Sequence, residues 1–149
     1  PELLYKYKGL KPFIDERTMN IHHSRHHYIY VKNLNIFFKK NNINNRSLTL
    51  TDLQSLCIRD LPFLRNNAGG HYNHSFFWNI LKNQKNKKKI SSSLKNAIIK
   101  KWKTINNMKK EFETKSIKLF GSGWCWLCKD KKNNLSIITP SQIDIWLVE

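Results

Sequence analysis

The chain has 149 residues, 40% of them hydrophobic, which is enough for one domain or two small ones with a real core. No apolar run approaches the roughly 18 residues that span a bilayer, so we expect no membrane partner. The formal net charge at pH 7 is +17, and no carboxylate occurs between Asp60 and Glu111. So large an excess of basic residues favours a polyanionic partner, most often a nucleic acid.

The first half of the chain is predicted to be helical. After an extended arm over residues 1–14, apolar and aromatic residues recur at three- and four-residue steps from Asp15, a plausible helix cap, to about Lys40. Three further features follow in order: a short helix capped by Thr51, an interruption at Pro62, and a helix from about His71 to Lys82. Gly69 and Gly70, just before that last helix, indicate a close approach of the backbone to a neighbour.

The second half changes from helical to strand periodicity. Ser91 to Ser93 offer a cap for a helix from Leu94 to about Met108, and another short helix is expected around Phe112. Two strands are then predicted, Ser116–Cys128 and Leu135–Thr139, joined by a turn over Asp130–Asn134.

Because the helices precede the strands, the sequence predicts an α+β fold. We expect an N-terminal helical hairpin over residues 1–88 and a C-terminal mixed domain with a small antiparallel sheet over residues 89–149.

The three cysteines, Cys57, Cys125 and Cys128, give no disulfide framework, which suggests a reducing compartment. Cys125 and Cys128 have CxxC spacing. On a strand, residues three apart point to opposite faces, so we favour two packed thiols. A nucleic-acid-binding module with a zinc site built from these cysteines and a histidine is the less favoured alternative.

All six histidines fall within residues 22 to 74. His22 and His26 lie four apart on a predicted helix and share a face that Tyr30 continues, while His71 and His74 lie three apart on another helix. Two such helices side by side could direct imidazoles, which suit Mn, Fe, Zn and Cu, into one cavity. The alternative is that these histidines are buried polar residues without a ligand.

Four segments of the chain resemble the iron/manganese superoxide dismutases. These segments are His22–Asn35 and Asn66–Trp78 (the two ligand helices), Phe120–Leu127 (the first strand of the sheet) and Ile143–Trp146 (the segment of the aspartate ligand). They cover nearly the whole chain in the family's order, so coincidence is a poor explanation.

The resemblance assigns roles to particular residues. It implies that His22, His74 and Asp144 are metal ligands for Mn or Fe, and that His26, Tyr30 and Gln142 are the catalytic residues if the protein is active. Glycine at position 70, where iron-type members carry glutamine, favours the manganese type. The resemblance also implies an aromatic shell made of Trp78, Trp124, Trp126 and Trp146.

The last residues depart from the family pattern. Val148 occupies the position of the fourth ligand, a histidine, and Leu147 replaces a glutamate that bridges to the partner subunit. Valine has no lone pair to donate, so the sequence predicts a vestigial metal set, no bound cofactor and a truncated C-terminal domain.

From these departures and the charge, our first hypothesis is a non-catalytic, RNA-associated protein of the mitochondrial small ribosomal subunit, in the mitochondrial matrix. Its expected partners are ribosomal RNA, neighbouring ribosomal proteins and a second dismutase-like protein in a heterodimer. The lysines expected to contact RNA are Lys82, Lys85, Lys87, Lys88, Lys89, Lys100, Lys101, Lys103, Lys109 and Lys110. The alternative is an active manganese or iron superoxide dismutase, which converts superoxide to oxygen and hydrogen peroxide.

Overall fold

The computed structural model describes residues 1–43, 48–56, 62–82 and 89–139, except for the side chains of residues 54–56. It divides into two compact units, Pro1–Lys87 and Lys88–Glu149, which are considered separately below. Among the described residues, no helix is both long and apolar enough to cross a membrane.

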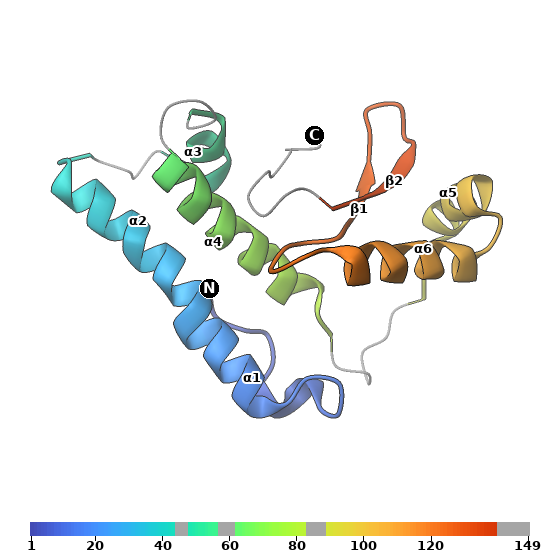
Figure 1. Cartoon of the computed structure of the whole chain (residues 1–149), viewed down its shortest axis with the longest axis horizontal. Coiled ribbons are helices and arrows are strands. Elements are labelled where there is room, and N and C mark those ends of the chain that lie inside the picture. The colour runs from blue at the N-terminus through green and yellow to red at the C-terminus, as the bar shows by residue number, and fades with distance from the viewer. Residues whose placement is uncertain (44–47, 57–61, 83–88, 140–149) are drawn as a thin grey trace. The chain divides into compact units, whose positions relative to one another are not determined.

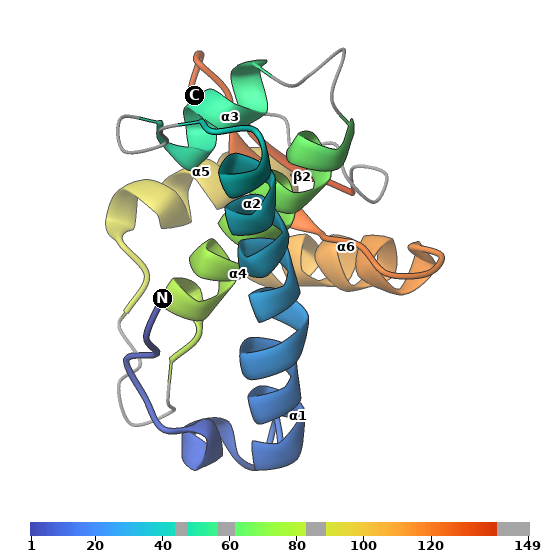
Figure 2. The same ribbon diagram turned by 90° about the vertical axis from the view of Figure 1, so that its left-hand side faces the viewer.

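The first unit begins with an arm that contains a short 3-10 helix, η1 (Tyr7–Leu10), and then enters one long helical segment. This segment consists of α1 (Glu16–Ile21), a π-helical turn η2 (His22–His27) and α2 (Tyr28–Lys40), and Figure 2 shows α1 and α2 as one continuous helix. Asp15 begins it as predicted, because its carboxylate accepts a hydrogen bond from the Thr18 backbone N–H at 2.9 Å.

Two helices follow in the first unit, α3 (Leu50–Leu56) and α4 (Pro62–Ile80). The Asp52 backbone N–H donates to the Thr49 hydroxyl and the Thr49 backbone N–H to the Asp52 carboxylate, so the cap of α3 is Thr49 and the prediction of Thr51 was wrong. Pro62, predicted as an interruption, is instead the first residue of α4, a position where its missing N–H has no helical partner to lose.

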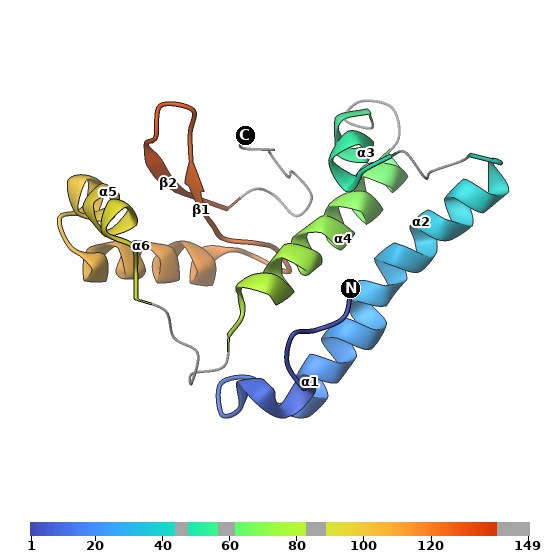
Figure 3. The same ribbon diagram turned by 180° about the vertical axis from the view of Figure 1, so that it is seen from behind.

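The segment from η2 to α2 runs antiparallel to α4, and the two lie side by side (Figures 1 and 3). Polar side chains pair across them in register: His22 with His74, His27 with His71, and Asn33 with Asn67. As the first residue number rises, the second falls, as expected for a helical hairpin.

Apolar clusters on either side of these polar pairs hold the helices of the hairpin together. The first consists of Leu34, Phe38, Leu53, Leu64 and Ala68, which come from α2, α3 and α4. The second contains Leu10, Met19 and Trp78, and so joins the N-terminal arm to both long helices. In this second cluster the Tyr5 hydroxyl also donates to the Trp78 carbonyl at 3.0 Å.

The second unit contains α5 (Ser92–Trp102), α6 (Ile105–Lys118), β1 (Trp126–Lys129) and β2 (Leu135–Ile138). The two strands pair antiparallel, with Trp126 opposite Ile138 and Lys129 opposite Leu135. As predicted, Ser91 caps α5. The core of this unit is formed by Ile98, Trp102, Leu135 and Ile137.

Three predicted boundaries in the two units are wrong. The helix expected from His71 begins at Pro62, so Gly69 and Gly70 lie inside α4. The helix expected over 94–108 is divided at Lys103, which adopts a φ of 67°, and Thr104 caps α6. The strand expected over 116–128 is only Trp126–Lys129, because α6 continues to Lys118.

The fold class itself is as predicted, with a helical N-terminal part followed by a C-terminal part that carries a small antiparallel sheet. The C-terminal residues on which the prediction of a truncated domain rests lie outside the described part of the chain.

Candidate metal centre

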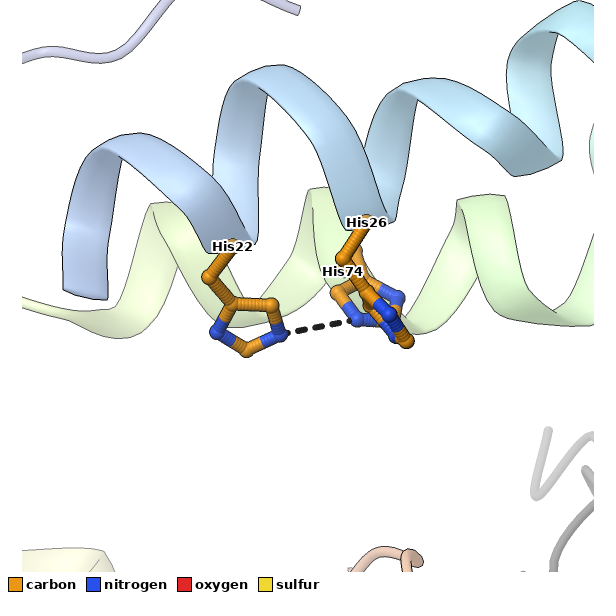
Figure 4. Close-up of side chains that lie close together, drawn as sticks. All are labelled: His22, His26 and His74. Atoms are coloured by element: carbon orange, nitrogen blue, oxygen red, sulfur yellow. Dashed lines mark hydrogen bonds between the residues drawn. The ribbon is translucent and has the colours of Figure 1, made fainter. Parts of the chain in front are cut away.

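Three imidazoles meet between the two long helices of the first unit. His22 and His26 come from η2 and His74 comes from α4, and Figure 4 shows their rings gathered on one side of the hairpin. One ring nitrogen from each lies within 4.8 Å of the others. Within the described ranges, this is the only group of histidine, cysteine or carboxylate side chains with such spacing.

The distance between the two predicted ligand nitrogens fits a shared cation. Nε2 of His22 and Nε2 of His74 are 3.0 Å apart. Two nitrogen ligands at about 2.1 Å from a metal and roughly 90° apart would be separated by about 3.0 Å. The separation therefore suits a hydrogen bond between the rings and is also compatible with ligation of one ion.

The protonation of His74 is fixed by its neighbour on the same helix. Nδ1 of His74 lies 2.6 Å from the Gly70 carbonyl oxygen, which can only accept, so Nδ1 carries the proton and donates. A neutral ring protonated at Nδ1 has its lone pair on Nε2, which faces His22. Metal-ligating histidines are commonly oriented in this way by a hydrogen bond from the other nitrogen.

Burial favours the neutral forms of His22 and His74, and the neutral imidazole is the form that binds metals. Desolvation lowers the pKa of His74 to about 4, although its bond to Gly70 opposes the shift. Desolvation also lowers the pKa of His22, with further lowering from His26 and His23. The neutral imidazoles and their convergent nitrogens therefore fit a manganese or iron ion.

Aromatic side chains line the same region. The Trp78 ring meets the His22 ring edge-on, with 5.0 Å between centroids, and only 2% of Trp78 is exposed. Tyr30 lies against His74 at 5.4 Å and against His26 at 5.3 Å. Its hydroxyl is 3.5 Å from Nε2 of His26, which is exposed, whereas His74 is buried. Water can thus reach the site on the side of His26.

Gly70 is required by the closeness of the two helices at this point. A Cβ atom at position 70 would lie 2.6 Å from ring carbons of Tyr30. The close approach predicted from the paired glycines is therefore present, although inside a helix.

A second histidine pair, which was not predicted, lies beside the first. Nε2 of His27 is 2.7 Å from Nδ1 of His71, and the Trp78 indole N–H donates to Nδ1 of His27 at 2.9 Å. Of the two histidines predicted to share a face of this helix, His74 thus faces His22 and His71 faces His27. The signal available in the sequence was the doubling His22-His23 and His26-His27.

Several predicted residues are not tested by this geometry. Gln142, Asp144 and Val148 lie outside the described residues, as do Lys85, Lys87 and Lys88. Asp144 therefore stays a predicted ligand and Gln142 a predicted catalytic residue. Trp124 and Trp126 belong to the second unit, where their rings stack on each other at 5.3 Å.

Two other predictions can be compared with the second unit. Cys125 and Cys128 are free thiols there, and neither belongs to the metal-binding group found above, which gives the zinc alternative no support. Among the described lysines predicted to contact RNA, the Lys101 ammonium donates to the Leu135 carbonyl. Lys101 is nevertheless exposed, as are Lys82, Lys89, Lys100, Lys103, Lys109 and Lys110.

Comparison with known proteins identifies the family. Residues 1–82 match the family model described as iron/manganese superoxide dismutases, alpha-hairpin domain, and residues 90–149 match the corresponding C-terminal domain. The chain therefore belongs to the iron/manganese superoxide dismutase family.

Named relatives support this membership. The chain is 41% identical over 141 residues to a superoxide dismutase (Mn) of Buchnera aphidicola subsp. Baizongia pistaciae, covering 93% of this chain and 66% of the relative. It is 38% identical over 145 residues to superoxide dismutase (Mn/Fe) 2 of Staphylococcus aureus strain N315, covering 95% of this chain and 71% of the relative. The chain thus spans about two thirds of the length of the relatives it matches.

These findings overturn the first hypothesis. A structural, RNA-associated protein of the mitochondrial ribosome was wrong, because the relatives that match over most of the chain are named as dismutases. The hypothesis rested on net charge and on a few terminal residues. A net charge of +17 indicates that a partner is negatively charged but not what kind of molecule it is. It suits a small anionic substrate as well as RNA. The heterodimer and the matrix location stay predictions without a test here.

Proposed function

We propose that this protein is a superoxide dismutase that uses manganese or iron, with His22 and His74 among its metal ligands. The single observation that carries the proposal is the facing pair of Nε2 atoms, 3.0 Å apart, one of them held as an acceptor by the bond from His74 to Gly70. Membership of the family and the named relatives support it. Asp144 is the proposed third ligand, on the resemblance alone.

The reaction converts two superoxide anions and two protons into oxygen and hydrogen peroxide. The bound metal would supply the one-electron oxidation and reduction. The chain's own residues have separate tasks: His22 and His74 bind the ion, and Trp78 excludes water from the His22 side. Tyr30 and the exposed His26, whose polar atoms lie 3.5 Å apart, are placed to pass protons from solvent.

The basic composition is compatible with this reaction. Superoxide is an anion, and a net charge of +17 raises the local concentration of anions near the protein. This attraction should weaken as ionic strength rises.

The test is the metal content and dismutase activity of the purified full chain, beside His74→Asn as a matched control. Asparagine can keep a donor near the Gly70 carbonyl but has no equivalent of Nε2. We expect manganese or iron near one ion per chain and activity that the control lacks. Full metal loading without any dismutation, or activity equal in both proteins, would refute the proposal.

Position 148 offers a second measurement, since valine stands where the resemblance places the fourth ligand. The substitution Val148→His should add an imidazole ligand and strengthen manganese binding by about tenfold or more. Losing a residue that only hydrogen-bonds a ligand already costs about 10- to 100-fold in affinity, and a ligand itself should matter at least as much. No change in affinity would show that residue 148 does not reach the metal.

A further inference from the structure

His27 is buried with both ring nitrogens in use, although the resemblance gives it no role. Only 2% of its surface is exposed. The Trp78 indole N–H donates to Nδ1 at 2.9 Å, and Nε2 lies 2.7 Å from Nδ1 of His71. A buried residue with two such bonds holds its ring in one orientation.

The direction of each hydrogen bond follows from the tryptophan. An indole N–H can only donate, so Nδ1 of His27 accepts and the neutral ring carries its proton on Nε2. Nε2 therefore donates to Nδ1 of His71. The chain of donors runs in one direction, from Trp78 through His27 to His71.

His27 also contacts two residues of α4 at the metal centre, His74 and Trp78. Its ring stacks on His74, with 5.3 Å between centroids and 19° between planes. The tryptophan that it holds meets the His22 ring edge-on at 5.0 Å. One side chain thus contacts one proposed ligand directly and the other through a single aromatic ring.

We propose that His27 is a positioning residue, which holds the Trp78 indole edge-on against His22 and so orients the His22 ring, so that Nε2 of His22 converges with Nε2 of His74. The inference deepens the proposed function and rests on it for the identity of the metal. His27 itself is not a ligand in this scheme, because its nitrogens face Trp78 and His71.

Two substitutions separate the two hydrogen bonds. In His27→Asn the amide oxygen takes the place of Nδ1 and can still accept from Trp78, while the bond to His71 is lost. In His27→Gln the longer amide reaches the position of Nε2, so the bond to His71 can remain while Trp78 loses its acceptor. Only the glutamine variant should therefore release the indole.

The first measurement needs neither activity nor metal. In the nitrogen-15-labelled, metal-free full chain, the indole N–H signal absent from Trp78→Phe belongs to Trp78. We expect slow exchange of that proton in the parent and His27→Asn, and fast exchange in His27→Gln, with ring signals of His22 shifted only in the glutamine variant. Unchanged His22 signals in His27→Gln would overturn the inference.

The second measurement is Mn²⁺ affinity by competition with a chelator. We expect His27→Gln to bind about 10- to 100-fold more weakly, and His27→Asn to stay within about threefold of the parent. Should His27→Gln fail to fold, Trp78→Phe removes the same hydrogen bond and should weaken binding similarly. Equal affinity of the parent and the folded variant that lacks the bond would overturn the inference.

The two proposals fail in distinguishable ways. A chain that binds Mn²⁺ with the expected ranking but dismutates no superoxide refutes the proposed function and leaves the positioning role intact. Dismutation and Mn²⁺ binding that are unchanged in His27→Gln refute the positioning role alone.

Discussion

The same two helices carry two histidine pairs that differ in what faces their nitrogens. In the pair His22 and His74, the Nε2 atoms face each other at 3.0 Å, and the proton of His74 is directed away to the Gly70 carbonyl. In the pair His27 and His71, the Trp78 indole donates to Nδ1 of His27, so the proton of His27 lies on Nε2. That nitrogen donates to Nδ1 of His71.

The difference indicates that hydrogen-bond partners, as well as spacing, determine which ring nitrogens keep a lone pair for a partner outside the pair. Both pairs cross between the helices, and both are partly or fully buried. In the first pair His74 presents only the lone pair of Nε2, which accepts from Nε2 of His22 and which a cation could take instead, whereas in the second pair the Trp78 N–H directs the proton of His27 onto His71. An imidazole is available to a cation when its other ring nitrogen donates a hydrogen bond, as Nδ1 of His74 does to the Gly70 carbonyl.

The largest expected effect comes from breaking each pair with the same substitution. His74→Asn removes Nε2 and should weaken Mn²⁺ binding by more than about 100-fold, because a ligand is lost and not merely its support. His71→Asn keeps an acceptor near Nδ1 for His27 and should change the affinity by less than about threefold. Both are measured by chelator competition on folded protein.

Equal losses in the two variants would contradict the comparison. They would mean that His71, too, contributes a ligand or that the pairs act as one unit. Circular dichroism of each variant serves as the control for folding.

The next effect is the loss of stability in acid. Burial lowers the pKa of His27 from 6.5 to about 3 and that of His74 to about 4. A group whose pKa is lower in the folded state stabilises the protein fully above its unfolded pKa, and this contribution is lost as the pH falls toward the folded value. Between about pH 6 and pH 4, each such histidine should reduce the free energy of unfolding by about 1.4 kcal/mol per pH unit.

Urea unfolding of the metal-free protein at pH 7, 6, 5 and 4 measures this slope. His27→Asn removes one of the two histidines with the largest shifts, so its slope should be smaller by about 1.4 kcal/mol per pH unit. Identical slopes for the parent and the variant would show that His27 is not buried as a neutral ring.

A smaller effect is expected at Gly70, where the helices approach closely and whose carbonyl accepts the hydrogen bond from Nδ1 of His74. Gly70→Ala places a Cβ 2.6 Å from the Tyr30 ring and should destabilise the protein by about 1–3 kcal/mol, despite the better helix propensity of alanine. Gly9→Ala is the matched control, since its Cβ would lie 3.5 Å from its nearest neighbour, in ordinary contact. Thermal unfolding of both variants should show a large shift only for Gly70→Ala.

The sequence predicted the roles of His22 and His74, whereas for the pair His27 and His71 it offered only the doubled histidines His22-His23 and His26-His27. A period of 3.6 residues places His22 and His26 on one face, as observed. It places His27, five residues after His22, about 140° around the helix from His22. The π-helical turn at His22–His27 adds a residue to the turn, and His27 then also reaches α4. Nothing in the local sequence specifies that extra residue.

Backbone conformation explains the wrong helix boundaries in the same way. Glycine is unfavourable inside a helix, so Gly69 and Gly70 were predicted to precede one. Both lie inside α4, where a Cβ at position 70 would clash with the Tyr30 ring. Lys103 ends α5 with a positive φ, which is uncommon for lysine and carries no sequence signal. The caps at Asp15 and Ser91 were predictable because they depend on local side chains only.

The smallest effect is expected from removing the cap of the long helix. This change tests whether the start of that helix holds both histidine pairs in place to the same extent. Asp15→Ala removes the bond to the Thr18 N–H and should lower the free energy of unfolding by about 1 kcal/mol. Because α1 leads into η2, which carries His22, His26 and His27, fraying there would loosen both pairs together. We therefore expect the Trp78 indole exchange rate and the Mn²⁺ affinity to change by a similar factor of a few. A change in one without the other would show that the two pairs are held independently of the helix start, by their contacts with α4 alone.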